Sequence, residues 1–72
     1  MITKEEKLQL IASHKHTLTA RKYSLELDVL KENAVTTPNS STLASLQNQI
    51  NEIDLQSAAL AAEEDLVNAQ QA

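Results

Sequence analysis

The 72-residue chain has no cysteine, glycine, tryptophan or phenylalanine, and only one proline and one tyrosine. Without cysteine, a disulfide framework is excluded. Without glycine, phosphate-binding loops and the tight turns of β-hairpins are disfavoured, because both depend on that residue. A chain this short gains only roughly 3–5 kcal/mol from a single core, so it usually needs a metal, a crosslink or an oligomeric partner.

Long apolar runs and a basic surface are also missing. No run reaches the ~18 residues of a membrane span, and the charged start of the chain argues against a signal peptide. We therefore expect no membrane partner and an intracellular or virion-associated location. All Lys and Arg residues precede residue 32, whereas the remainder holds only acids, at Glu52, Asp54, Glu63, Glu64 and Asp65. This distribution predicts no nucleic-acid partner, because such a protein clusters its basic residues on one face.

What the chain does contain is two heptad patterns, one on each side of Pro38. Alternating steps of three and four residues keep side chains on one face of an α-helix, as in a coiled coil. We call these positions the seam: Leu8, Ile11, Lys15, Leu18, Lys22, Leu25 and Val29, then Leu43, Leu46, Ile50, Ile53, Ser57, Leu60, Glu64 and Val67. They predict an all-α fold, an antiparallel two-helix hairpin that associates into a larger helical bundle or ring.

We expect one domain over residues 1–72, with a helix over about 3–34, a loop over about 35–40 and a helix over about 41–69. Thr3 and Glu6 have the spacing of a capping box, which marks a helix start. The second helix has two candidate starts. Thr37 caps a helix with Pro38 in its first position, or the helix begins at Ser40 or Ser41.

Folding the chain at Pro38 predicts which seam residues face one another. The expected pairs are Val29 with Leu43, Leu25 with Leu46, Leu18 with Ile53 and Ile11 with Leu60. The same register predicts that Lys22 approaches Glu52 and that Lys7 lies beside Glu64 and Asp65. Lys15 opposite Ser57 is the weakest layer.

Each helix carries further apolar residues away from the seam. They are Ala20, Tyr23, Leu27, Leu30 and Ala34 on the first helix, and Leu55, Ala58, Ala59, Ala62, Leu66 and Ala69 on the second. A helix that is apolar on two sides is buried on two sides, although scattered exposed aliphatic residues also occur on monomers. We predict a protein interface at Tyr23, Leu27, Leu30, Leu55, Ala58, Ala59, Ala62 and Leu66.

The polar residues do not form a reaction centre. His14 and His16 are two residues apart, so on a helix they point in nearly opposite directions and do not share a metal ion. Glu63, Glu64 and Asp65 are adjacent, so they diverge on a helix, and we expect no apolar pocket around them. We therefore expect no catalytic residue, metal, cofactor or small-molecule substrate, and no enzyme activity.

The segment Leu43–Asp54, which reads LASLQNQINEID, resembles the coiled-coil segments of small helical proteins from tailed bacteriophages. The resemblance implies a virion or assembly component and assigns no residue a role. We expect a structural or assembly protein that packs on itself or on a larger protein. The alternative is a small acidic regulator or inhibitor that binds a cellular protein through its second helix.

Overall fold

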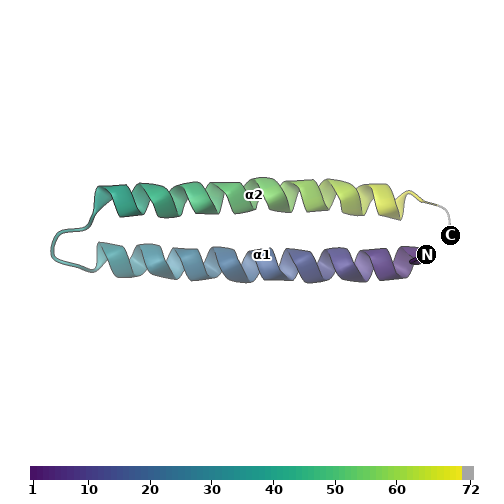
Figure 1. Ribbon diagram of the computed structural model, residues 1–72, viewed down its shortest axis with the longest axis horizontal. Coiled ribbons are helices and arrows are strands. Elements are labelled where there is room, and N and C mark those ends of the chain that lie inside the picture. The colour runs from purple at the N-terminus through teal and green to yellow at the C-terminus, as the bar shows by residue number, and fades with distance from the viewer. Residues whose placement is uncertain (71–72) are drawn as a thin grey trace.

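The computed structural model describes residues 1–70, which form two α-helices lying side by side in antiparallel orientation (Figure 1). Helix α1 spans Lys4–Asn33 and helix α2 spans Ser40–Asn68. The molecule is a rod of 57 × 15 × 15 Å with both termini at one end (Figure 1). The predicted all-α helical hairpin is confirmed. The last two residues of the predicted domain, 71–72, lie outside the described residues.

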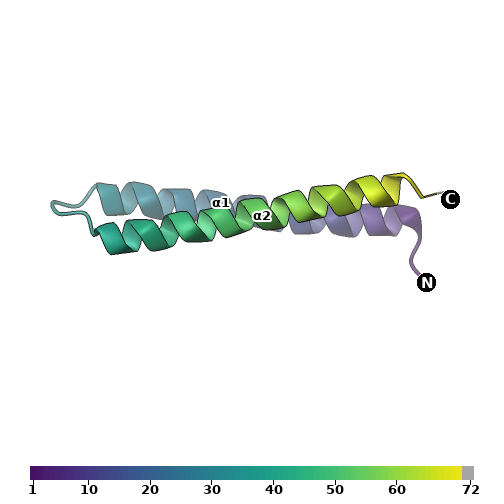
Figure 2. The ribbon, with the colours of Figure 1, turned by 90° about the horizontal axis from the view of Figure 1, so that it is seen from above.

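The seam holds the two helices together. Seen from above, α1 and α2 cross at a shallow angle (Figure 2), as expected for helices joined along a heptad pattern. Every predicted seam position is buried or half-buried. The most deeply buried side chains of the described residues are Ile11, Ile50, Ile53 and Val67. The core is therefore a single narrow row of side chains between two helices, as the heptad spacing predicted.

The predicted capping box opens α1. The Thr3 hydroxyl accepts a hydrogen bond from the Glu6 backbone N–H at 3.1 Å, and the Glu6 carboxylate accepts one from the Thr3 backbone N–H at 3.4 Å. Together these bonds satisfy two polar N–H groups at the helix start. At the other end, the backbone N–H of Ala34 donates to the carbonyls of Leu30 and Lys31 and closes the helix.

Helix α2 begins at Ser40, with Asn39 as its N-cap. The Asn39 side-chain oxygen accepts a hydrogen bond from the Thr42 backbone N–H at 3.0 Å. The Asn39 backbone N–H donates to the Glu32 carboxylate at 2.8 Å, so the last turn of α1 positions the cap of α2. The predicted start with a Thr37 cap is wrong, and the alternative start at Ser40 is confirmed. Asn is at least as good a cap as Thr, and here Glu32 holds it in place.

Seam and surface residues should differ sharply in their contribution to stability. Ile53 is 3% exposed, so Ile53→Ala should lower the free energy of unfolding by about 2–5 kcal/mol through lost contacts and a cavity. The matched control is Leu10→Ala at a site that is 52% exposed, where the change should be within about 0.5 kcal/mol. Urea unfolding followed by circular dichroism measures both. Equal effects would contradict the assignment of the core to the seam.

The two candidate caps of α2 are separable by mutation. Asn39→Ala removes the acceptor for the Thr42 N–H and should cost about 1 kcal/mol. Thr37→Ala should leave stability nearly unchanged, because the Thr37 side chain caps nothing among the described residues. Thermal unfolding of the two variants provides the comparison. A larger loss for Thr37→Ala would move the start of the helix back to Pro38.

Candidate interaction surface

The residues predicted to form an interface all lie on the surface of the hairpin. The large ones are strongly exposed: Tyr23 at 61%, Leu27 at 41%, Leu30 at 65%, Leu55 at 67% and Leu66 at 63%. Ala58, Ala59 and Ala62 are exposed as well. Within the single chain, nothing among residues 1–70 covers these side chains.

The exposed apolar residues form a second heptad pattern on each helix. We define the α1 stripe as Ala20, Tyr23, Leu27, Leu30 and Ala34, and the α2 stripe as Leu55, Ala59, Ala62, Leu66 and Ala69, with Ala58 beside it. The stripes follow the same steps of three and four residues as the seam, so each forms one continuous apolar face of its helix. Each helix therefore has two apolar faces, the seam against the other helix and an exposed stripe.

The two stripes lie at opposite ends of the rod. Each stripe occupies the C-terminal half of its helix and reaches the C-cap, Ala34 in α1 and Ala69 in α2. Because the helices are antiparallel, the α1 stripe lies toward the connecting loop and the α2 stripe toward the termini (Figure 1). At ~1.5 Å per residue, both stripes are roughly 21 Å long.

The stripes also face opposite sides of the rod. The groove beside the α1 stripe is lined by Tyr23, Glu26, Leu27, Leu30, Gln47 and Asp54, among others. The groove beside the α2 stripe is lined by His14, Arg21, Gln56 and Ala59, among others. The first groove is lined by residues that directly follow a seam position, namely Glu26, Gln47 and Asp54. The second groove is lined by residues that directly precede one, namely His14, Arg21 and Gln56. On a helix, positions before and after a given residue are about 200° apart.

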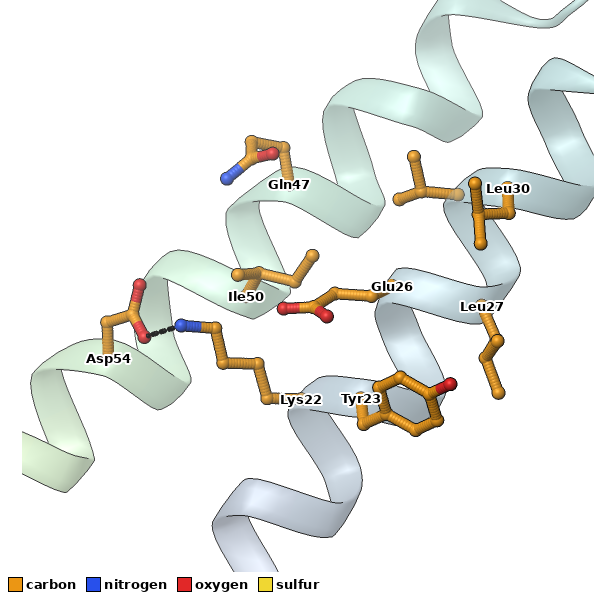
Figure 3. Close-up of a pocket in the computed structure, with 9 residues that line it drawn as sticks. Lys22, Tyr23, Glu26, Leu27, Leu30, Gln47, Ile50 and Asp54 are labelled. Atoms are coloured by element: carbon orange, nitrogen blue, oxygen red, sulfur yellow. Dashed lines mark hydrogen bonds and ion pairs between the residues drawn. The ribbon is translucent and has the colours of Figure 1, made fainter.

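In the groove beside the α1 stripe, polar and apolar side chains of α1 point in different directions. Lys22 and Glu26 extend toward α2, whereas Leu27 points away from it (Figure 3). Tyr23 lies on the surface, and its hydroxyl makes no hydrogen bond within residues 1–70. An exposed tyrosine beside leucines is typical of contact surfaces, because its ring contributes a large apolar area and its hydroxyl remains available.

Two ion pairs link the helices along the seam. The Lys22 ammonium lies 2.7 Å from a carboxylate oxygen of Asp54, and the Lys15 ammonium lies 3.2 Å from one of Glu64. The predicted pairing of Lys22 with Glu52 is therefore wrong. So is the placement of Lys7 beside Glu64 and Asp65, because the Lys7 ammonium donates to the side chain of Gln70 at 3.4 Å.

The direction of helical side chains explains both errors. Long side chains lean toward the N-terminus of their own helix. In an antiparallel pair, a lysine on α1 therefore reaches a residue further along α2, and the acid on α2 leans toward it. The prediction matched backbone positions that lie directly opposite. It did not include the direction of the side chains, and it therefore missed the ion pair between Lys15 and Glu64.

The environment of Lys22 favours its charged form. The hydrogen bond to Asp54, and then the negative charge of that carboxylate, raise the pKa of the Lys22 ammonium. The Lys22 side chain is 38% exposed, so water weakens this attraction. The pair therefore selects the register of the two helices more than it stabilises them.

Acidic residues surround the α2 stripe. Glu63 and Asp65 are exposed on either side of it and form no ion pair within the described part of the chain. His14 and His16 are exposed too, and residues 1–70 contain no group of side chains arranged to hold a metal ion. The α2 stripe is thus an apolar band with a negative border.

Among residues 1–70, four large exposed apolar residues lie outside the predicted interface, Met1, Ile2, Leu10 and Val35. Ile2 and Leu10 line a groove at the end of the rod where the termini meet, beside Ile11 and Val67. Leu10 directly precedes the seam residue Ile11, and this position in the sequence indicates that it lies on the rim of the seam. Ile2 precedes α1, where helical periodicity gives no information.

Comparisons add no relative from which to transfer a role: no protein-family model, curated protein or solved structure matches the chain. Neither helix of the described residues is long and apolar enough to cross a membrane. What the arrangement provides is two exposed apolar stripes on a two-helix rod, one of them with an acidic border.

The Lys22–Asp54 pair predicts a specific pH dependence. Because the folded state raises the pKa of Lys22, the pair stabilises the fold below the ordinary lysine value of about 10.4 and loses this effect as the pH rises through the raised value. Lys22→Gln should therefore lower the melting temperature at neutral pH and have little effect in strong alkali.

Arg21→Gln is the control for Lys22→Gln, because it removes the same charge from a residue that stays protonated at these pH values. Its effect on melting should change far less over the same pH range. Circular dichroism melts at several pH values measure both variants. A Lys22→Gln effect that stays constant up to strong alkali would show that the ion pair contributes nothing to the fold.

Proposed function

We propose that this chain is a non-enzymatic structural or assembly element, and that the α1 and α2 stripes are its contact surfaces. The observation that carries the proposal is the exposure of two ordered apolar stripes on a rod whose core is one row thick. Solvated helix faces of a monomer are normally polar. A stripe that repeats the spacing of the seam is built to receive another helix.

The exposed area supports the same proposal. The chain exposes 5437 Å², whereas a compact monomer of 7.9 kDa exposes about 4,400 Å². The excess of about 1,000 Å² is close to the roughly 800 Å² that each partner contributes to a standard protein interface. Association would therefore bring the chain to the burial expected of a stable protein.

The setting we propose is a virion or its assembly, with many copies of the hairpin or a larger protein as the partner. This step rests on the resemblance of Leu43–Asp54 to coiled-coil segments of small tailed-bacteriophage proteins. Rods with apolar flanks suit such a role, because repeated helix contacts produce ordered assemblies from short chains.

A regulator that docks α2 in a groove of a cellular protein is the second candidate. The exposed acids Glu52, Glu63 and Asp65, with no basic residue on α2, favour it. A regulator binds its target in a fixed small ratio and stays small when purified alone. A structural subunit associates with itself or recurs in many copies within one assembly.

Sedimentation equilibrium of the purified chain over a wide concentration range tests the proposal. An assembly element should increase in mass with concentration, or occur in many copies in the particle from which it is isolated. A one-chain mass at every concentration, with one-to-one binding to a cellular target, would instead establish the regulator.

Leu27→Asp and Leu46→Asp separate assembly from folding. At Leu27, on the α1 stripe, an aspartate should weaken association at least about tenfold, because each contact would enclose an unpaired carboxylate. Helicity by circular dichroism should remain. At Leu46, half-buried in the seam, the same substitution should reduce helicity itself. Loss of helicity in Leu27→Asp without any oligomer in the wild type would show that the α1 stripe supports the fold.

A further inference from the structure

We propose that the partner of the α1 stripe is the α2 stripe of a second copy of the same chain. This inference rests on the proposed function and specifies its contact. Each copy then offers two different surfaces, one for the copy before it and one for the copy after it. Three self-contacts are conceivable: α1 with α1, α2 with α2, and α1 with α2.

Charge opposes a contact between two α2 stripes. Glu63 and Asp65 border this stripe, and no basic residue lies on α2 to offset them. Pairing two copies of the stripe would bring these carboxylates together, and like charges across an interface are unfavourable. The α1 stripe carries a smaller surplus, because Lys31 pairs with Asp28 at 3.3 Å and the charges of Lys22 and Glu26 act on each other. Of the available surfaces, α1 therefore suits the acidic border of α2 better.

The sizes of the side chains favour the mixed contact too. The α1 stripe has its large residues, Tyr23, Leu27 and Leu30, in the centre and alanines at both ends. The α2 stripe is small at Ala59 and Ala62, which lie between the larger Leu55 and Leu66. Large residues opposite small ones interdigitate, whereas two bulky centres hold helices apart. The stripes are also equally long.

A contact between two α1 stripes would leave the α2 stripe in water. The mixed contact covers both, and the position of the stripes determines what it builds. The α1 and α2 stripes lie at opposite ends and on opposite sides of the rod. A two-fold dimer therefore does not bury both stripes of each copy. The contact is head-to-tail, and it continues into a ring or a filament.

Two matched variants test this arrangement. Leu30 and Leu66 are 65% and 63% exposed, so Leu30→Asp and Leu66→Asp introduce the same charge at equally exposed sites, one on each stripe. The wild type should form species larger than a dimer. Each variant alone should sediment as a monomer, because one of its two surfaces is blocked. An equimolar mixture should form a one-to-one heterodimer, in which the intact α1 stripe of Leu66→Asp meets the intact α2 stripe of Leu30→Asp.

Leu10→Asp, outside both stripes and 52% exposed, is the control and should keep the mass of the wild type. Native mass spectrometry of variants made with different isotopes identifies the heterodimer directly. If Leu66→Asp remains oligomeric alone, or if the mixture stays monomeric, the mixed contact is overturned while assembly through another surface stands. If the wild type is a monomer at every concentration, self-assembly itself fails along with this contact.

Discussion

The structure depends on one seam that is a single row of side chains wide. Ile53 and Val67 are nearly sealed from water by their neighbours, while most other residues of the hairpin keep an exposed flank. Two helices in contact cover only one face each, and no third element of the described chain covers the rest. The rod shape, the excess of exposed area and the uncovered stripes are all consequences of this constraint. A hairpin of this kind reaches the burial of an ordinary domain only by adding helices from outside.

The local features of the fold were readable from the sequence. The seam follows from spacing alone, and the Thr3–Glu6 capping box is defined by two residues within one turn. The start of α2 was harder to predict, because Asn39 owes its position to a carboxylate seven residues earlier, at Glu32. The ion pairs of Lys15 and Lys22 were missed for a related reason. Their partners depend on the direction in which side chains lean across an antiparallel pair, and residue spacing within one helix does not contain that information.

For the exposed stripes too, the sequence predicted one part and only the structure shows the other. Periodicity places Tyr23, Leu27 and Leu66 away from the seam, and the structure shows them exposed. Their arrangement on opposite ends and sides of the rod exists only once α1 and α2 lie antiparallel. The sequence therefore predicted that apolar surface was left over, but it gave no means to count the surfaces or to relate them. The relative position of the two stripes decides whether copies would form a closed pair or a repeating assembly.

Charge favours a pairing of α1 with α2 within the seam and, in the proposed assembly, at the stripes as well. Within the seam, Lys15 and Lys22 meet acids of α2, and pairing one α1 seam with another would place lysines where these acids now lie. On the outer faces, the acids beside the α2 stripe oppose its pairing with itself. Apolar spacing alone does not distinguish these pairings, because one row of leucines packs against any other row of leucines. An α1 that holds every basic residue of the chain and an α2 that holds none discriminate between them. The uneven charge thus favours contact between α1 and α2 inside the molecule and, in the assembly we propose, between molecules.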